Sequence, residues 1–335
     1  MTVDRPPPEL HVPGRSIPVP GHLSSEAAGV LGMGRMDLFP FPAQDDIDGW
    51  RSMVAEREQV MRSFLTEAFE TLPVSCETVS VDGVTVHVLT PDGVDADDPR
   101  VYLDIHGGAL ITGSGDSCRG MGAMAAVRNQ VCTWSVDYRM PPDHPYPAAL
   151  DDCMRVYRDL LRGHRPAHLV VGGSSAGGNL AAALVLRARD EGLPIPAAAV
   201  LTSPEVDLTE SGDSFHANLG VDTVLTESLM PANLLYADGH DLNDPYLSPL
   251  FGDFSAGFPP TFLSTGTRDL FLSNTVRLHR ALRNAGITAE LHVMEAAPHG
   301  GFFGSSPEDA EIGREVRRFI GEHCGDGRIG SAAGT

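Results

Sequence analysis

A serine between glycines is the clearest candidate for chemistry in this sequence. Residues 173–177 read Gly-Ser-Ser-Ala-Gly, so Ser175 is the central serine of a G-x-S-x-G pattern. A nucleophilic serine sits at a sharp strand-to-helix turn, where flanking glycines (here Gly173 and Gly177) let neighbouring backbones approach closely. Short Gly/Ser patterns also occur in plain loops and in nucleotide-binding turns, so the motif alone leaves those alternatives open.

A nucleophilic serine requires a histidine and a carboxylate. On an open α/β sheet they follow the serine in the order acid, then histidine. Of the 13 histidines, His299 lies in the glycine-rich loop directly after the last expected strand, and Asp269 follows the strand before it. The rival acids are Asp207, after an earlier strand, and Glu295, close to His299. Because active sites gather at the carboxyl ends of parallel strands, we expect a catalytic triad of Ser175, Asp269 and His299.

A second glycine-rich turn, His106-Gly107-Gly108-Ala109, follows directly after an apolar run. Backbone N–H groups in such a turn can point at a developing oxyanion. We expect Gly108, Ala109 and Ala176 to supply the donors of this oxyanion hole. Gly107 belongs to the same hole and mainly permits the turn. His106 is a possible base, but we expect a structural role in which it anchors the loop by hydrogen bonding its backbone.

These residues meet only if the chain forms an open sheet whose strands end at a common edge. Asp82-Gly83 separates two short runs at 76–81 and 84–89 and predicts a hairpin. Further strands are expected at 101–105, 131–138, 168–173, 197–203, 260–266 and 289–295, with helices at 147–163, 176–192, 273–286 and 308–323. This alternation predicts an α/β fold, with a mostly parallel eight-stranded sheet and helices on both faces.

Two segments fall outside this alternation. Residues 1 to about 45 are expected to be irregular, and apolar residues at helical spacing predict an amphipathic helix at 46–71. The stretch from about 206 to 257 looks like an inserted helical segment. We expect an N-terminal extension and cap helix at 1–72 and a hydrolase core in two parts, 73–205 and 258–323. An inserted cap segment is expected at 206–257, between the two parts of the core, and a flexible tail at 324–335. Glu205, where the chain leaves the sheet, and Trp50 are candidates for lining the pocket.

Composition excludes several classes of function. The chain of 335 residues has no lysine, so Schiff-base chemistry and a lysine-containing phosphate loop are both ruled out. A net charge of −21 argues against nucleic acid or an anionic membrane as partner, because phosphate contacts need clustered cations. Five cysteines without C-x-x-C spacing make zinc and a disulfide framework unexpected. We therefore expect no metal or organic cofactor.

The remaining expectations concern location and assembly. No apolar run approaches the ~18 residues of a membrane helix, and the Pro-rich N-terminus lacks a signal peptide's apolar region. A cytoplasmic protein without membrane or nucleic-acid partners is expected. A homodimer is possible, because an exposed edge strand such as 289–295 could pair two subunits.

These motifs together resemble the hormone-sensitive-lipase-like branch of the α/β-hydrolase esterases, over about residues 75–323. The family's HGGG motif resembles residues 106–109, its GDSAGG motif residues 173–178, and its DYRLAPEH stretch residues 137–144. The family's acid motif, Asp-Pro-Leu-x-Asp, is kept only as Asp269-Leu270-Phe271-Leu272-Ser273, without the proline and the second carboxylate. The resemblance implies an α/β-hydrolase fold with a helical cap over the site.

The expected function is hydrolysis of carboxylic esters with short to medium acyl groups, through a Ser-His-Asp triad and an acyl-enzyme. The substrate is then a small-molecule ester. A lactone hydrolase is the alternative, because the GTRDL variant of the acid motif looks like that of bacterial lactone hydrolases. A non-catalytic small-molecule receptor, which this family also contains, is a further alternative that the presence of His299 disfavours.

Overall fold

The computed structural model describes residues 10–36, 40–95 and 97–325. Residues 326–335 of the expected tail lie outside this part of the chain, as do residues 1–9 and 37–39 of the expected N-terminal extension.

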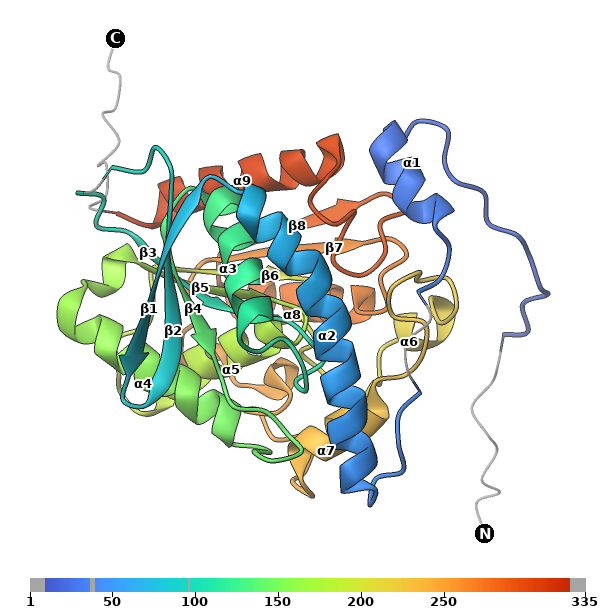
Figure 1. The fold of residues 1–335 in the computed structure, drawn as a ribbon, viewed down its shortest axis with the longest axis horizontal. Helices are drawn as coiled ribbons and strands as arrows, with labels where there is room; N and C mark the ends of the chain where they lie inside the picture. The colour runs from blue at the N-terminus through green and yellow to red at the C-terminus, as the bar shows by residue number, and fades with distance from the viewer. Residues whose placement is uncertain (1–9, 37–39, 96, 326–335) are drawn as a thin grey trace.

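An eight-stranded sheet forms the centre of the described chain, in the order β1-β2-β4-β3-β5-β6-β7-β8 (Figure 1). Its strands are β1 (Val74–Val81), β2 (Val84–Pro91), β3 (Val101–Ile105), β4 (Cys132–Asp137), β5 (Leu169–Ser174), β6 (Ala198–Thr202), β7 (Thr261–Gly266) and β8 (Ala289–Met294). β2 pairs antiparallel with both β1 and β4, whereas the strands from β4 to β8 run parallel. The predicted fold class, with a mostly parallel sheet, is therefore confirmed.

Helices cover both faces of this sheet. The described helices are α1 (Ser25–Gly32), α2 (Ile47–Thr71), α3 (Asp116–Asn129), α4 (Ala148–Gly163), α5 (Ala176–Asp190), α6 (Ser214–Ala217), α7 (Met230–Ala237), α8 (Leu272–Asn284) and α9 (Pro307–His323), with short 3₁₀ turns at Pro166–His168, Pro249–Phe251 and Phe254–Ala256. Neighbouring residues of β5 face opposite sides of the sheet. Val171 packs in the apolar cluster that includes residues of α4, α5 and α8, whereas Val170 packs in the cluster that includes Phe319 of α9. Because helices cover both faces of the sheet, β3 and β7 are buried along their whole length.

Two helices differ from the sequence expectations. α3 was not predicted, because its small residues give no apolar stripe; instead they allow close packing, and a Cβ at Gly122 would lie 2.5 Å from Cβ of Ser135 on β4. α1 lies in the stretch expected to be irregular. Ser24 caps it by accepting a hydrogen bond from Ala27 N, and Glu308 of α9 accepts from both Ser24 N and Ser24 Oγ. A contact some 280 residues away in the chain thus stabilises this helix.

The segments outside the alternation lie together on one side of the molecule, where Figure 1 shows α1, α2, α6 and α7. Trp50 and Met53 of α2 share an apolar cluster with Ile111, which follows β3, and with Ala232 of α7. The stretch between β6 and β7 therefore packs against the long N-terminal helix. No helix in the described ranges is both long and apolar enough to cross a membrane.

Candidate active site

Ser175 occupies the sharp turn between β5 and α5. Its backbone has φ 59° and ψ −122°, a sparsely populated conformation that costs on the order of 1–3 kcal/mol for a residue with a side chain. A Cβ at Gly173 would lie 2.4 Å from the carbonyl oxygen of Ile105, and a Cβ at Gly177 only 1.8 Å from it. Both flanking positions must be glycine because the end of β3 packs directly against this turn.

The turn after β3 lies against Ser175. A Cβ at Gly107 would lie 3.0 Å from the Ser174 carbonyl oxygen and 3.4 Å from Cβ of Ser175. The loop then folds back on itself, because the Gly108 carbonyl accepts hydrogen bonds from Ile111 N (3.1 Å), Thr112 N (2.9 Å) and Thr112 Oγ1 (3.0 Å).

The expected oxyanion donors keep their N–H groups available. In the described part of the chain, the N–H groups of Gly108, Ala109 and Ala176 donate to no protein acceptor. Ala176 is the first residue of α5, where the N–H has no partner within the helix and the helix dipole favours negative charge. Ala109 has φ 54°, so its side chain costs roughly 1–2 kcal/mol that a glycine would avoid.

His106 contacts the loop backbone rather than the site. Its Nδ1 lies 2.8 Å from the Gly107 carbonyl oxygen, and its ring stacks on Tyr138 at 4.0 Å between centroids. Tyr138 OH in turn donates to the His106 carbonyl at 2.8 Å. Burial lowers the pKa of His106 to about 4, so the ring is neutral at pH 7. These contacts hold the start of the loop on the sheet.

Asp269 and His299 form a buried pair. His299 Nδ1 lies 3.0 Å from Asp269 Oδ1, and Asp269 Oδ2 accepts from Thr265 Oγ1 at 2.7 Å. Burial alone would raise the pKa of Asp269, but the charge of His299 and the hydrogen bond to it hold that pKa below its usual value. Burial alone would lower the pKa of His299; the charge of Asp269 and its hydrogen bond outweigh this and raise it. The arrangement can orient an imidazole and stabilise its protonated form.

The rival acids are placed elsewhere. Asp207 pairs with Arg277 at 2.6 Å and also accepts from Thr209 and Ser211. Glu295 is exposed. Of the three carboxylates considered, Asp269 is therefore the one that contacts the His299 ring.

Asp222, which the sequence reasoning missed, ties the acid and histidine loops together. One of its oxygens accepts from Leu270 N at 2.8 Å, and both lie 3.3 Å from His299 N. It comes from the stretch between β6 and β7, so a residue outside the sheet fixes the backbones of both loops. Locally, Asp222 accepts a hydrogen bond from Val224 N, two residues further on, as an aspartate in a turn commonly does. Such a turn is too common in sequences to indicate a site.

Glu205 is fully buried beside the site. Its N–H donates to the Ser175 carbonyl at 3.1 Å, and its own carbonyl accepts from Asn179 Nδ2 at 2.7 Å. Burial raises the pKa of Glu205 to about 8, against the opposing effect of a hydrogen bond with Asn233. The side chain is therefore a neutral acid at pH 7.

This protonated state predicts a pH-dependent stability. The folded chain keeps the Glu205 proton up to about pH 8, whereas the unfolded chain loses it near the ordinary value of 4.5. The contribution of Glu205 to the free energy of unfolding is therefore fully present below pH 4.5. As the pH rises from 4.5 to about 8, it decreases by up to about 1.4 kcal/mol per pH unit. Glu205→Gln should remove this part of the decline and be more stable than the wild type at pH 8. Urea unfolding from pH 5 to 8, with exposed Glu311→Gln as control, tests this; parallel curves for wild type and Glu205→Gln would contradict it.

Trp50 packs in the contact between α2 and the loop after β3. It is fully buried, its ring lies 5.6 Å from that of Phe41, and its indole N–H donates to the Ala43 carbonyl at 3.0 Å. Because its polar atom already has a partner, Trp50 presents only apolar surface to its neighbours.

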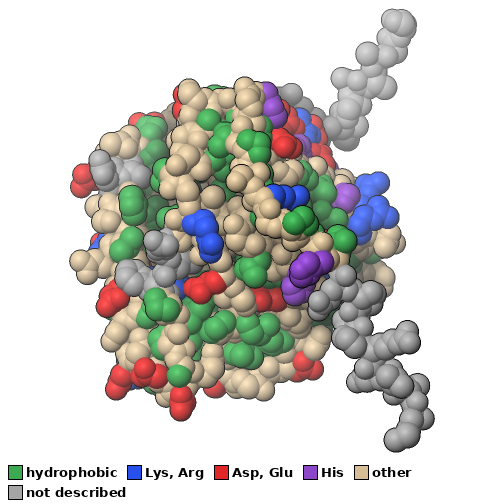
Figure 2. Space-filling model, turned by 90° about the vertical axis from the view of Figure 1, so that its right-hand side faces the viewer, with side chains coloured by type: hydrophobic (Ala, Val, Ile, Leu, Met, Phe, Trp, Pro, Cys, Tyr) green, Lys and Arg blue, Asp and Glu red, His purple; other side chains and the backbone are tan. Residues whose placement is uncertain are grey.

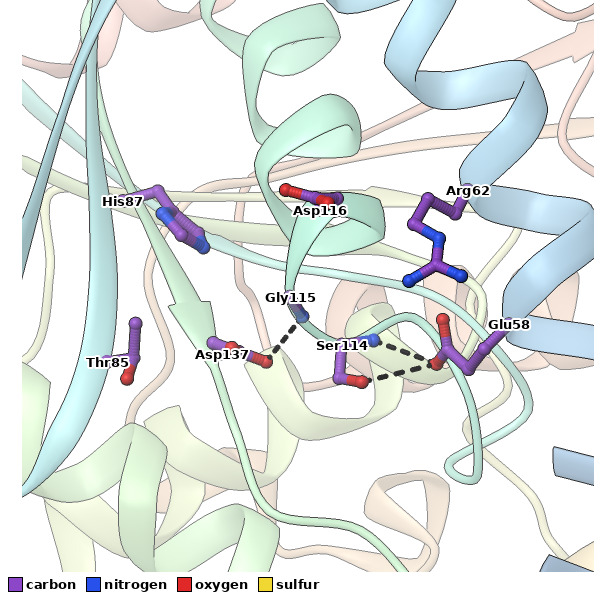
Figure 3. Close-up of a pocket in the computed structure, with 8 residues that line it drawn as sticks. All are labelled: Glu58, Arg62, Thr85, His87, Ser114, Gly115, Asp116 and Asp137. Atoms are coloured by element: carbon purple, nitrogen blue, oxygen red, sulfur yellow. Dashed lines mark hydrogen bonds between the residues drawn. The ribbon is translucent and has the colours of Figure 1, made fainter. Parts of the chain in front are cut away.

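Two cavities lie beside the same loop. One of about 400 Å³ is lined by Glu58, Arg62, Thr85, His87, Ser114, Gly115, Asp116 and Asp137 (Figure 3). A second of about 580 Å³ shares Glu58, Ser114 and Asp137 with the first. Neither is lined by a residue of the expected triad.

Two groups of side chains within the described ranges could geometrically hold a metal ion. They are His106 with Cys118 and Asp137, and Glu290 with His292 and Glu315. Neither group includes Ser175, Asp269 or His299.

Known proteins resemble this chain over most of its length. A family model described as the alpha/beta hydrolase fold matches residues 102–303. An esterase of Acinetobacter venetianus is 34% identical over 191 residues, which cover 56% of this chain and 63% of that protein's own length. The crystal structure of an esterase called E25 superposes with a TM-score of 0.88 at 34% identity, covering 95% of this chain and 99% of that one.

A second solved structure bears on the branch of the family. It is an esterase from the bacterial hormone-sensitive lipase family, with a TM-score of 0.77 at 28% identity, covering 90% of this chain and 99% of that one. The resemblance read from the sequence motifs is thus confirmed. The chain belongs to the alpha/beta hydrolase fold family and to its hormone-sensitive-lipase-like branch.

Proposed function

We propose that this chain hydrolyses carboxylic esters with short to medium acyl groups through a covalent acyl-enzyme on Ser175. The observation that carries the proposal is the buried Asp269–His299 pair, which follows β7 and β8 in the same sheet whose β5 ends at the Ser175 turn. Parallel strands end at one edge of a sheet, which supports a common site for these three residues. The relatives and solved structures that resemble the chain are named as esterases, which supports the same chemistry.

The proposed reaction has two halves. Ser175 Oγ attacks the ester carbonyl while His299 Nε2 takes the hydroxyl proton, and the same proton then passes to the leaving alkoxide as the C–O bond breaks. In the second half, a water molecule attacks the acyl carbonyl while His299 takes a proton from that water. The bond between the acyl carbon and Ser175 Oγ then breaks, and Oγ receives the proton from His299. Asp269 fixes the imidazole tautomer through Nδ1. The N–H groups of Gly108, Ala109 and Ala176 stabilise the oxyanion in both halves.

A pH profile follows from the base role of His299. Only the neutral ring can accept the serine proton, and Asp269 raises its pKa above the ordinary 6.5. The kcat/KM of an aryl ester should therefore rise once with pH, with a midpoint above 6.5, and EDTA should not change it. Initial rates from pH 5 to 9 measure this. A midpoint at or below 6.5, a rate that falls between pH 6 and 8, or a chelator-sensitive rate would contradict the mechanism.

An acyl-length series of aryl esters, measured beside a medium-ring lactone, tests the substrate class. The proposal predicts turnover of short and medium acyl esters. Faster turnover of the lactone would favour the alternative in which the cleaved alcohol stays attached to the acyl group. Binding of these compounds without turnover would favour a receptor and contradict the proposal.

We further propose that residues 1–72 and 206–257 cap the site and line its pocket, with the core in 73–205 and 258–323. The packing of α2 against α7 through Trp50 and Ala232 supports this division. Figure 2 views the molecule from the side where these segments lie, and apolar side chains reach the surface there in several places. Such a surface suits the acyl chain of a small ester. Pairing of two copies through β8 and a cytoplasmic location complete the proposal.

A further inference from the structure

One carboxylate of α2 binds the backbone that follows the oxyanion turn. Glu58 Oε1 accepts hydrogen bonds from Gly113 N and from Ser114 N (2.9 Å), and Glu58 Oε2 accepts from Ser117 Oγ at 3.1 Å. Figure 3 shows the Glu58 side chain reaching from its helix to Ser114. A single side chain outside the sheet thus satisfies two consecutive backbone donors in the loop that precedes α3.

The bound segment packs directly on the oxyanion turn. Gly113 has φ 111°, and a Cβ there would lie 2.5 Å from His106 Nδ1 and 2.6 Å from the Gly107 carbonyl oxygen. A shift of Gly113 toward the turn would therefore displace Gly107 and, with it, the donors that follow. A shift away would remove the packing that holds the Gly107 peptide in place.

The core also holds this loop by hydrogen bonds. Tyr138, which follows β4, binds the His106 carbonyl, and Asp137 at the end of β4 accepts from Gly115 N at 3.1 Å. α2 adds to them both the Glu58 hydrogen bonds and the apolar cluster of Trp50 with Ile111. The oxyanion loop is therefore held between the sheet on one side and α2 on the other.

We propose that Glu58 is a positioning residue, which holds α2 to the oxyanion loop and thereby sets the direction of the Gly108 and Ala109 N–H groups. This inference rests on the proposed esterase function. It implies that α2 does more than cover the site, since the geometry of the oxyanion hole depends on where that helix lies. Glu58 itself does not touch the substrate.

The test compares Glu58→Ala with Glu58→Gln and with Glu56→Ala, a change at an exposed position of the same helix. Loss of one oxyanion donor costs about 100- to 1000-fold in kcat. In Glu58→Ala the loop donors are displaced but not removed, and the Ala176 donor stays in place. We therefore expect a smaller loss, of roughly 10- to 100-fold in kcat. KM should change by less than about twofold. The glutamine amide can accept from Gly113 and Ser114 and donate to Ser117, so Glu58→Gln should stay within about threefold of wild type.

A readout without substrate separates this inference from the proposed function. Hydrogen exchange of the amides at 113 and 114 should be at least 10-fold faster in Glu58→Ala than in wild type, and unchanged in Glu56→Ala. If Glu58→Ala fails to fold, Glu58→Asp, one methylene too short to reach, replaces it. Unchanged exchange, unchanged kcat, a loss confined to KM, or a Glu58→Gln variant as slow as Glu58→Ala would overturn the inference. Lack of ester turnover by the wild type would instead overturn the proposed function.

Discussion

Replacing Ser175 by alanine should lower kcat for an aryl ester by about a million-fold, as removal of the nucleophile does in other serine hydrolases. Without Oγ no acyl-enzyme can form, and the residual rate comes from the oxyanion donors and binding alone. Folding should survive and stability should change little, because alanine bears the same cost for this backbone conformation as the native serine. Steady-state kinetics and thermal unfolding of the purified variant measure both effects.

Ser174→Ala is the matched control. Ser174 is the last residue of β5, and its backbone carbonyl oxygen lies close to Gly107. The alanine variant keeps this contact, because the side chain takes no part in it. Most of the activity should remain. A loss as large in Ser174→Ala as in Ser175→Ala would mean that the frame of the motif has been assigned to the wrong serine.

The second large effect is expected at Asp269. Asp269→Asn should leave the fold intact but lower kcat by up to about ten-thousand-fold, because an amide at this position favours the wrong imidazole tautomer. The variant should also lose the raised pKa of His299, so the midpoint of its residual pH profile should move down.

Asp207→Asn provides the comparison, since Asp207 is the buried carboxylate that the sequence left as a rival. Its partners are Arg277, Thr209 and Ser211, so the variant should lose stability and keep its kcat. If Asp207→Asn instead shows the larger fall in kcat at equal folding, the acid lies after β6 and the assignment of Asp269 is wrong.

The sequence predicted the sheet, and with it the strand ends that the proposed site residues follow, because buried strands depend on local pattern. Buried parallel strands are short apolar runs, and Ser175, Asp269 and His299 each follow one of them. The glycines of the turn were readable for the same reason: Gly173 and Gly177 meet a neighbouring backbone at distances that no side chain tolerates. α3 escaped prediction because it packs through small residues and has no apolar stripe.

Other parts of the site depend on contacts between distant segments. Asp222 binds Leu270 and His299 from far along the chain, and nothing in its neighbours distinguishes it from an ordinary turn aspartate. Glu58 is one of several charged residues on an amphipathic helix until the loop of Gly113 is placed beside it. Positions of this kind require the tertiary structure, because their role lies in the partner and not in the local sequence.

Covalent labelling with a fluorophosphonate identifies the nucleophilic serine directly. Such a probe phosphonylates a serine only when that serine is activated by a base and its oxyanion is stabilised. Trypsin does not cleave the Arg165–Pro166 bond and therefore gives a peptide of residues 163–187. Its only serines are Ser174 and Ser175, so its fragment ions identify the labelled one. We predict one phosphonyl group per chain, on Ser175, with loss of ester turnover in proportion to labelling. Label on Ser174, or complete inactivation with neither serine modified, would contradict it.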